Sequence, residues 1–179
     1  MIENLDWDGE GKALDIGCGN GPLAVNLAKK YPNANVVGID YWGGQWDYSK
    51  ETCERNAQLE GVGARVSFQK ASAVQLPFPD GYFDAVVSNL VFHEVSSARD
   101  KIGLIREALR VLKKGGTFSL QDLFLIKKIY GDTDELIATL KNYGLTEVEF
   151  VATRDSKFIP RIFRLPFMIG TIGLIKGQK

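Results

Sequence analysis

The chain has 179 residues, in which 22 lysines and arginines balance 22 aspartates and glutamates, so its formal net charge is zero. This length predicts a single domain over residues 1–179 that can hold a core without disulfides or a metal ion. A net charge of zero gives no electrostatic case for nucleic acid as a partner. The 45% apolar content excludes wholesale disorder.

With only two cysteines, a disulfide framework is excluded, and the sequence contains no Cys/His cluster that would indicate a metal site. We therefore expect a cytoplasmic, reducing setting. Cys18 is expected to be a small packing residue, whereas Cys53 lies on a charged surface helix with no evident partner. The best apolar run, residues 165–175, has about half the length of a bilayer span, so no transmembrane segment is predicted. The acidic N-terminus has no signal-peptide pattern.

Apolar runs alternate with amphipathic stretches over the first two thirds of the chain. A strand is predicted at 13–16, followed by a helix that carries Leu23 and Leu27 on one face, with Asn20 as its N-cap. Further strands are predicted at 35–39, 65–69, 83–90 and 117–125, and further helices at 47–59, 98–113 and 133–142. The glycine pair 115–116 is expected to end the helix at 98–113.

The alternation of strands and helices predicts right-handed crossovers and a parallel sheet with helices on both faces. Two C-terminal strands, at 147–153 and 169–176, are separated by about fifteen residues without a helical period, so we predict that this pair is antiparallel. The expected fold is α/β, with a doubly wound, mostly parallel seven-stranded sheet and an antiparallel C-terminal strand pair.

The most informative segment is Asp15-Ile-Gly17-Cys-Gly19-Asn-Gly21, between the first strand and the first helix. Glycines there permit positive φ and a close approach of a ligand, whereas a plain tight turn would not require three of them. The dinucleotide fingerprint GxGxxG would need glycine where Pro22 stands. A carboxylate at Asp15 would repel a pyrophosphate but favour an ammonium or a sulfonium. The pattern therefore favours a cationic nucleoside over NAD.

Asp40 closes the second strand, 23 residues after the first glycine of this segment. An acidic residue at that point can accept hydrogen bonds from the two ribose hydroxyls of a nucleoside. Alone it would be weak support, because Asp is common where strands end. Together with the glycine segment, it predicts a nucleoside site.

With these motifs in place, the chain resembles the class I, Rossmann-like S-adenosylmethionine-dependent methyltransferases. The resemblance runs over residues 12–122 and rests on four motifs in order, ALDIGCGNG, GID, LPFPDGYFDAVVSN and RVLKKGG. It implies the strand order 3-2-1-4-5-7-6 and S-adenosylmethionine as the cofactor.

The resemblance also implies roles for individual residues. The first motif is expected to wrap the methionine part of the cofactor, Asp40 to bind the ribose, and Tyr41 to pack on the adenine. Ser72 stands where many relatives have an acidic residue, and its hydroxyl can accept only a weaker, uncharged bond from the adenine amino group. The implied cofactor-binding residues are Asp15, Gly17, Cys18, Gly19, Asp40, Tyr41, Ser72, Ala73 and Asn89.

Two departures from the family pattern concern access to the site. The loop after Asp40 is longer than usual and carries Trp42 and Trp46, which either form an adenine wall or pack the helix that follows. Few residues precede the first strand, where relatives place one or two lid helices. We therefore expect the N-terminal lid helices to be absent or trimmed, which leaves acceptor recognition open.

Three residues are candidates for acid–base chemistry, His93 and Glu94 after the fourth strand and Asp122 at the end of the fifth. Methyl transfer needs mainly alignment and exclusion of water, and a base only where the acceptor arrives protonated. His93 is thus a base, an acceptor contact, or a helix-start residue bonded to the backbone. Residues 88–91 do not match the (D/N)PP(Y/F) motif of relatives that methylate amino groups of bases or glutamine.

The segment 157–176 is unusually apolar and carries Arg161 and Arg164. It is either a loop followed by a buried strand or an apolar, basic rim of the site that receives a lipid-like acceptor. The function expected from the sequence is S-adenosylmethionine-dependent methylation of a small molecule. The alternatives are a cofactor-binding module without turnover and, less favoured, an NAD-dependent oxidoreductase.

Overall fold

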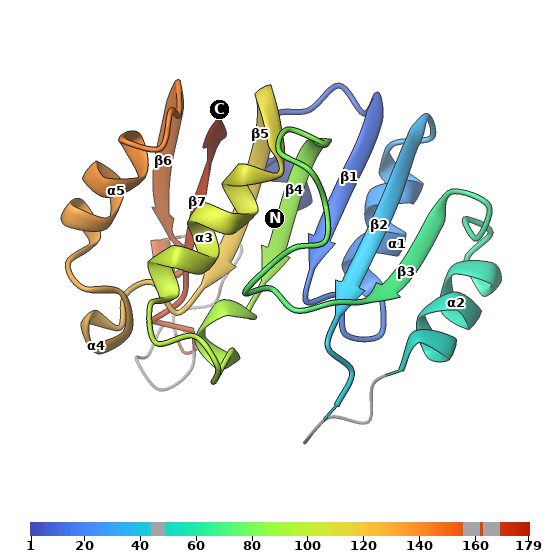
Figure 1. The fold of residues 1–179 in the computed structure, drawn as a ribbon, viewed down its shortest axis with the longest axis horizontal. Helices are drawn as coiled ribbons and strands as arrows, with labels where there is room; N and C mark the ends of the chain where they lie inside the picture. The colour runs from blue at the N-terminus through green and yellow to red at the C-terminus, as the bar shows by residue number, and fades with distance from the viewer. Residues whose placement is uncertain (44–48, 156–161, 163–168) are drawn as a thin grey trace.

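A computed structural model describes residues 1–43, 49–155, 162 and 169–179. One seven-stranded sheet forms the centre of the molecule, in the order β3-β2-β1-β4-β5-β7-β6 (Figure 1). Its strands are β1 (Gly11–Ile16), β2 (Ala34–Asp40), β3 (Val66–Lys70), β4 (Phe83–Asn89), β5 (Leu112–Asp122), β6 (Glu147–Ala152) and β7 (Gly173–Gln178). This confirms the predicted sheet and its order.

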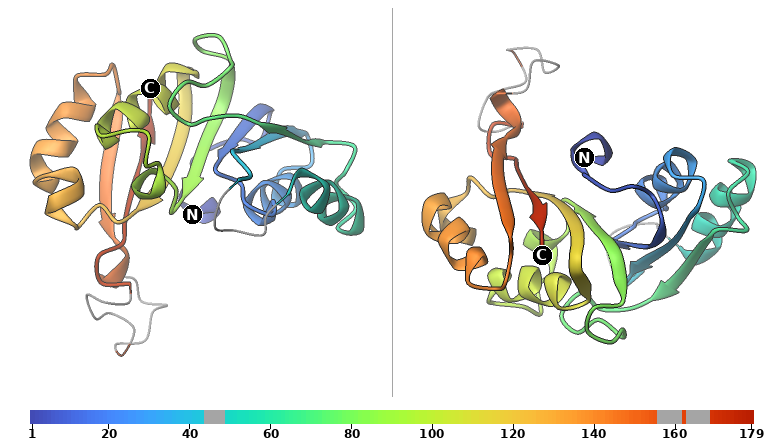
Figure 2. Two further views of the ribbon diagram at one scale, coloured as in Figure 1. Left: turned by 60° about the horizontal axis from the view of Figure 1, so that its bottom comes forward. Right: turned by 90° about the horizontal axis from the view of Figure 1, so that it is seen from above.

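The helices cover both faces of the sheet, as the strand–helix alternation predicts (Figure 2). The α-helices are α1 (Pro22–Lys30), α2 (Lys50–Leu59), α3 (Lys101–Arg110), α4 (Lys127–Tyr130) and α5 (Thr133–Lys141), and the 3-10 turns are η1 (Ile2–Asn4), η2 (Phe92–Glu94) and η3 (Thr153–Asp155). One core cluster joins the sheet to α1 and α2, and the other joins it to α3, α4 and α5. Within the described residues, no helix has the length and apolarity needed to cross a membrane.

The glycine segment leads directly into α1. Gly21, with φ of 84°, occupies the N-cap position, so the predicted capping role of Asn20 is wrong. Pro22 fits the first helical position because its missing N–H would have no helical partner there. The helix α2 begins later than predicted, after Ser49, whose hydroxyl accepts a hydrogen bond from the Thr52 N–H at 3.1 Å.

The helix predicted at 98–113 is shorter, and the role given to its terminal glycines is wrong. α3 ends at Arg110, and β5 already begins at Leu112, which pairs with Phe83. Of the apolar stripe predicted for this helix, Ile105 and Leu109 are buried on α3, whereas the fully buried Leu112 belongs to the sheet core. Both glycines lie inside β5, where the pairing with β4 shifts register between Phe83 and Ala85.

The antiparallel C-terminal pair is confirmed. β7 inserts between β5 and β6 and pairs antiparallel with both, with Leu120 opposite Ile175 and Phe150 opposite the same residue. The strand begins at Gly173, later than predicted, after a turn at 169–171. The segment 157–176 suggested an apolar, basic rim. Most of it, including Arg161 and Arg164, lies outside the described residues.

Candidate functional site

The glycine loop, residues 17–21, is folded tightly against the end of β2. The backbone N–H groups of Gly17 and Cys18 both donate to the Ile39 carbonyl, at 2.8 and 2.9 Å, and the Gly21 N–H donates to the Cys18 carbonyl at 2.7 Å. Gly17, Gly19 and Gly21 have positive φ, at 72°, 56° and 84°, a backbone conformation that is unfavourable for residues with a side chain. The loop thus brings bare backbone to the carboxyl edge of the sheet, where open α/β sheets bind ligands.

Asp40 and Trp42 connect this loop to the end of β2. One Asp40 carboxylate oxygen accepts the Gly19 N–H at 2.8 Å, and the other accepts the Trp42 N–H at 3.0 Å. The Trp42 indole N–H in turn donates to the Gly19 carbonyl at 2.9 Å. Trp42 therefore packs on the glycine loop, a contact that neither predicted role included, while Trp46 lies outside the described residues.

The helix α2 supports the loop from the other side. The Cys53 thiol donates to the Gly19 carbonyl at 3.1 Å, and the Asn56 amide donates to the Asn20 carbonyl at 2.9 Å. Cys53 is fully buried, so the expectation of a surface cysteine without a partner is wrong. Cys18 is buried in the same core cluster, as expected of a packing residue, and both cysteines are free thiols.

Asp15 lies beneath the loop, in β1, with 1% of its surface exposed. Its Oδ2 is buried without a hydrogen-bond partner in the described part of the chain. Burial raises the pKa of Asp15 to about 7, a hydrogen bond from the Ala24 backbone opposes this shift, and the Asp40 carboxylate adds to it. A cationic group above the loop would offset this unfavourable buried charge.

The other implied cofactor residues lie along the same edge, because the neighbouring strands β3, β2, β1 and β4 are parallel. Tyr41 follows β2 and is 65% exposed, with the Lys70 ammonium 5.1 Å from its ring centre. Ser72 follows β3, and its hydroxyl accepts the Val74 N–H at 3.2 Å, with the half-buried Ala73 between them. Asn89 ends β4 and is exposed.

A second group of side chains lies at the ends of β4 and β5. The His93 Nδ1 is 2.7 Å from the Asp122 Oδ1, and the His93 Nε2 is 3.8 Å from the Glu94 Oε1. Asp122 is completely buried. The three acid–base candidates thus form one cluster, which the sequence did not indicate, because His93 and Asp122 are separated by a whole helix and strand.

This cluster and the glycine loop are neighbours. A Cβ added at Gly17 would overlap the methyl groups of Val91, which lies two residues before His93. The Ser88 hydroxyl of β4 also donates to the Ile16 carbonyl at 3.0 Å, which fixes the end of β4 against the end of β1. The glycine loop and the imidazole therefore share one edge of the sheet.

Comparison with known proteins identifies the family to which the chain belongs. The family model described as "Methyltransferase domain" matches residues 14–120, well over half of the chain. The chain belongs to this family. The match runs from the strand that carries Asp15 to within two residues of Asp122.

Several curated methyltransferases are related to this methyltransferase domain. A sterol 24-C-methyltransferase of Aspergillus fumigatus is 36% identical over 69% of this chain and 31% of its own length. The 27-O-demethylrifamycin SV methyltransferase of Amycolatopsis mediterranei is 36% identical over 64% of this chain and 39% of its own length. Methyltransferase GfsG of Streptomyces halstedii is 32% identical over 97% of this chain and 56% of its own length. The chain thus spans about a third to about half of these relatives.

Solved structures share the fold of this methyltransferase domain. The [4+2]-cyclase SpnF superimposes with a TM-score of 0.71 over 99% of this chain and 78% of its own, at 23% identity. The geranyl diphosphate C-methyltransferase of Streptomyces coelicolor A3(2), solved with S-adenosylhomocysteine, gives a TM-score of 0.69 over 99% of this chain and 76% of its own, at 17% identity.

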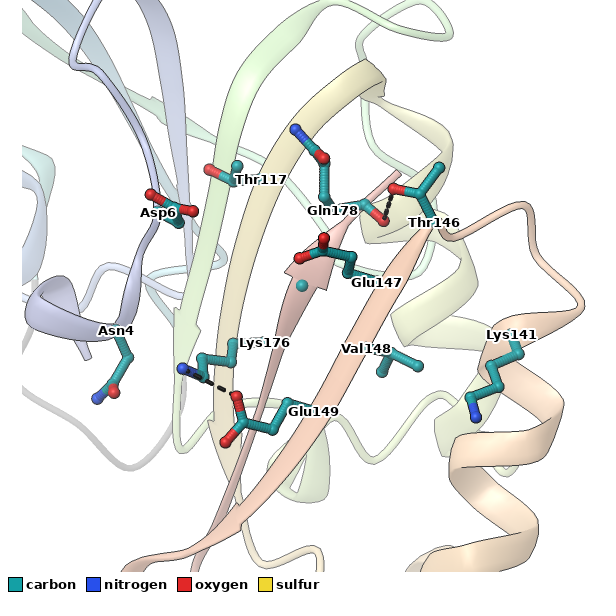
Figure 3. Close-up of a pocket in the computed structure, with 11 residues that line it drawn as sticks. Asn4, Asp6, Thr117, Lys141, Thr146, Glu147, Val148, Glu149, Lys176 and Gln178 are labelled. Carbon is teal, nitrogen blue, oxygen red and sulfur yellow. Dashed lines mark hydrogen bonds and ion pairs between the residues drawn. The ribbon is translucent and has the colours of Figure 1, made fainter.

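The methyltransferase domain also has a polar hollow of about 470 Å³ away from the glycine loop (Figure 3). It lies between the N-terminal segment, with Asp6, and the strands β5, β7 and β6, with Thr117 on β5. Its floor includes the ion pair of Lys176 and Glu149, at 3.1 Å. None of the predicted cofactor or acid–base residues lines this hollow. The candidate site is therefore the carboxyl edge of the sheet, where those residues lie, and not the hollow.

Proposed function

We propose that this methyltransferase domain binds S-adenosylmethionine at the glycine loop and transfers its methyl group to a small-molecule acceptor. The sulfonium of this cofactor, when bound, supplies an activated methyl carbon with a good leaving group. The protein's task is then to bind, orient and exclude water. Membership of the family supports the proposal, and so does the arrangement of two carboxylates around the loop.

The observation that carries this proposal is the unpaired, buried Oδ2 of Asp15. An isolated buried carboxylate is costly, and a ligand with an ammonium and a sulfonium reduces that cost. A pyrophosphate at the same loop would increase it, which weighs against NAD. The residues present therefore fit S-adenosylmethionine, with Gly17 to Gly19 as the cradle for its methionine part and Asp40 for its ribose.

The acceptor is proposed to be a small, largely apolar molecule. The names of the relatives support this class, because they include a sterol methyltransferase, a rifamycin methyltransferase and a geranyl diphosphate methyltransferase. The zero net charge supports a small molecule over a nucleic acid. The two free thiols support a reducing, cytoplasmic setting.

Thermal unfolding with and without ligand tests cofactor binding without knowledge of the acceptor. A ligand at a hundredfold excess over its Kd stabilises the native state by about 2.7 kcal/mol. For a domain of this size, that raises the Tm by roughly 5–11 °C. We expect this shift with S-adenosylhomocysteine and almost none with NAD or NADP.

A Tm shift with NAD and none with S-adenosylhomocysteine would overturn the proposal. The Asp40→Ala variant is the matched control, since a roughly 10- to 150-fold rise in its Kd should remove about half to nine tenths of the S-adenosylhomocysteine shift at the same ligand concentration. Cofactor binding without methylation of any small molecule would favour the alternative, a binding module without turnover. The fold alone does not decide between them, because the [4+2]-cyclase SpnF shares it.

A further inference from the structure

The His93 ring is held in one orientation by Asp122. Asp122 Oδ1 accepts the Leu123 N–H at 2.6 Å and lies 2.7 Å from His93 Nδ1, and its Oδ2 accepts the Phe92 N–H at 2.8 Å. The carboxylate is therefore fixed by the backbone of both loops, one after β4 and one after β5. Because it is completely buried, it cannot itself meet an acceptor.

This geometry determines which ring nitrogen carries the hydrogen. The Asp122 oxygens accept hydrogen bonds from backbone N–H groups, so Nδ1 must donate to Oδ1. In the neutral ring, Nε2 then keeps its lone pair. Glu94 Oε1 is 3.8 Å from Nε2, beyond hydrogen-bonding distance, and the His93 side chain is 19% exposed. The basic nitrogen is the one that faces away from the buried carboxylate.

Charged and titratable groups face the His93 ring from the neighbouring elements. Asp122 approaches from β5 and Glu94 from the same 3-10 turn. The buried Tyr130 hydroxyl of α4 lies by Asp122 and stays protonated, because burial and that carboxylate raise its pKa. The Lys101 ammonium lies against the Val95 carbonyl, at 2.6 Å, two residues beyond His93. A carboxylate thus lies near each ring nitrogen, at 2.7 Å from Nδ1 and 3.8 Å from Nε2.

We propose that His93 Nε2 is the general base of the reaction, that Asp122 is its positioning residue, and that the acceptor reacts through an oxygen that carries a proton. The proposal rests on the proposed function. The acceptor oxygen forms a bond to the methyl carbon while the carbon–sulfur bond breaks, and that electron pair stays on sulfur as the neutral thioether. The hydroxyl proton passes to Nε2 and then to water. An amine with a free lone pair would need no such base.

The first test reads the tautomer and needs no acceptor. His93 is the sole histidine of the chain, so its ring nitrogen signals are unambiguous in ¹⁵N-labelled protein from which any affinity tag has been removed. We expect the neutral ring to carry its hydrogen on Nδ1. In Asp122→Asn the side-chain amide can donate to the ring, so the hydrogen should move to Nε2. A wild-type ring with the hydrogen on Nε2, or no change in the variant, would overturn the proposal.

The second test reads transfer from S-adenosylmethionine to matched phenols, alcohols and amines, with methylated product detected by mass spectrometry. We expect methylated oxygen in the wild type and a loss of about 10²- to 10⁴-fold in kcat for His93→Gln. Calorimetry should show the Kd for S-adenosylhomocysteine unchanged in that variant. Ser97→Ala, at an exposed position of the same loop, is the matched control and should keep full activity.

These outcomes separate the two proposals. If the wild type fails to bind S-adenosylhomocysteine, the proposed function itself is wrong. If it binds but His93→Gln methylates phenols at the wild-type rate, or if only amines are methylated, the role of His93 is wrong and the proposed function stands. A protein that binds the cofactor but methylates no phenol or alcohol also counts against the base.

Discussion

The carboxylate of Asp40 binds the backbone of Gly19, with 2.8 Å between Oδ2 and the amide nitrogen. Its other oxygen accepts the Trp42 N–H at 3.0 Å. Each carboxylate oxygen can accept a further hydrogen bond, so both remain able to receive a ribose hydroxyl. Asp40 therefore shapes the glycine loop and keeps acceptor capacity for the proposed nucleoside.

Replacement of Asp40 by Ala should weaken cofactor binding. The loss of charge-assisted hydrogen bonds to the ribose, at roughly 1.5–3 kcal/mol, corresponds to about a 10- to 150-fold rise in Kd. The Asp40→Asn variant keeps one acceptor oxygen without the charge, so its Kd should lie between those of the wild type and Asp40→Ala. Titration calorimetry with S-adenosylhomocysteine measures this, and an unchanged Kd in a folded Asp40→Ala protein would refute the ribose assignment.

Replacement of Asp15 by Asn should discriminate between charged and uncharged ligands. The Asp15 carboxylate attracts the ammonium and sulfonium of S-adenosylmethionine, whereas adenosine has neither. We therefore expect the Kd for S-adenosylmethionine to rise more than the Kd for adenosine, both measured by calorimetry. Equal losses for the two ligands would reduce Asp15 to a structural role in the turn.

The same residue predicts how stability depends on pH. Because the pKa of Asp15 is raised to about 7 in the folded protein, from 3.8, the native state binds a proton that the unfolded chain releases. The free energy of unfolding should therefore fall as the pH rises from about 4 to about 7, by up to about 4 kcal/mol for this group. Asp15→Asn should lack this contribution.

Urea unfolding of both proteins at about pH 5 and about pH 8 measures the effect, since titrations shared by the two proteins cancel in the difference. Asn should be the more stabilising residue at the higher pH. Cofactor binding to the wild type should also tighten as the pH rises through about 7, because the ionised carboxylate attracts the cationic ligand. If the free energy of unfolding and the cofactor Kd each depend on pH in the same way in the wild type and in Asp15→Asn, Asp15 does not cause these effects.

Strand and helix periodicity predicted the sheet, since each apolar run of the first half became a buried strand. It failed at the junction of α3 and β5, where Leu112 continues the helical stripe in sequence but pairs with Phe83 in the sheet. Gly116 shows why the glycines did not end the helix there. A Cβ at that position would lie 2.9 Å from the Asp84 carbonyl, so the glycine serves a close approach of two strands.

Candidate cofactor residues could be proposed from the sequence because the glycine loop and Asp40 are each signalled within a few residues. The pairing of His93 with Asp122 could not, since it depends on the adjacency of β4 and β5 and on a turn that rotates the ring toward β5. The partner of Cys53 was missed for the same reason. Its thiol meets the Gly19 carbonyl only once α2 packs beside the loop.

Gly17 offers a test of how closely the loop and the end of β4 must approach. Its φ of 72° disfavours any side chain, and an added Cβ would also overlap the methyl groups of Val91. Gly61 has the same φ with nothing within 4 Å, so Gly61→Ala is a matched control that carries only the backbone cost. That cost is about 1–2 kcal/mol, and the overlap should add roughly 1–3 kcal/mol to Gly17→Ala.

The Val91→Ala change should relieve the overlap, because it removes the methyl groups that the new Cβ would meet. In a double-mutant cycle of urea unfolding, the Gly17→Ala/Val91→Ala protein should therefore be more stable than the sum of its single changes predicts, by at least about 1 kcal/mol. Additive losses, or equal losses for Gly17→Ala and Gly61→Ala, would mean that Val91 does not pack on the loop. In that case the imidazole two residues further along would no longer be placed beside the proposed cofactor site.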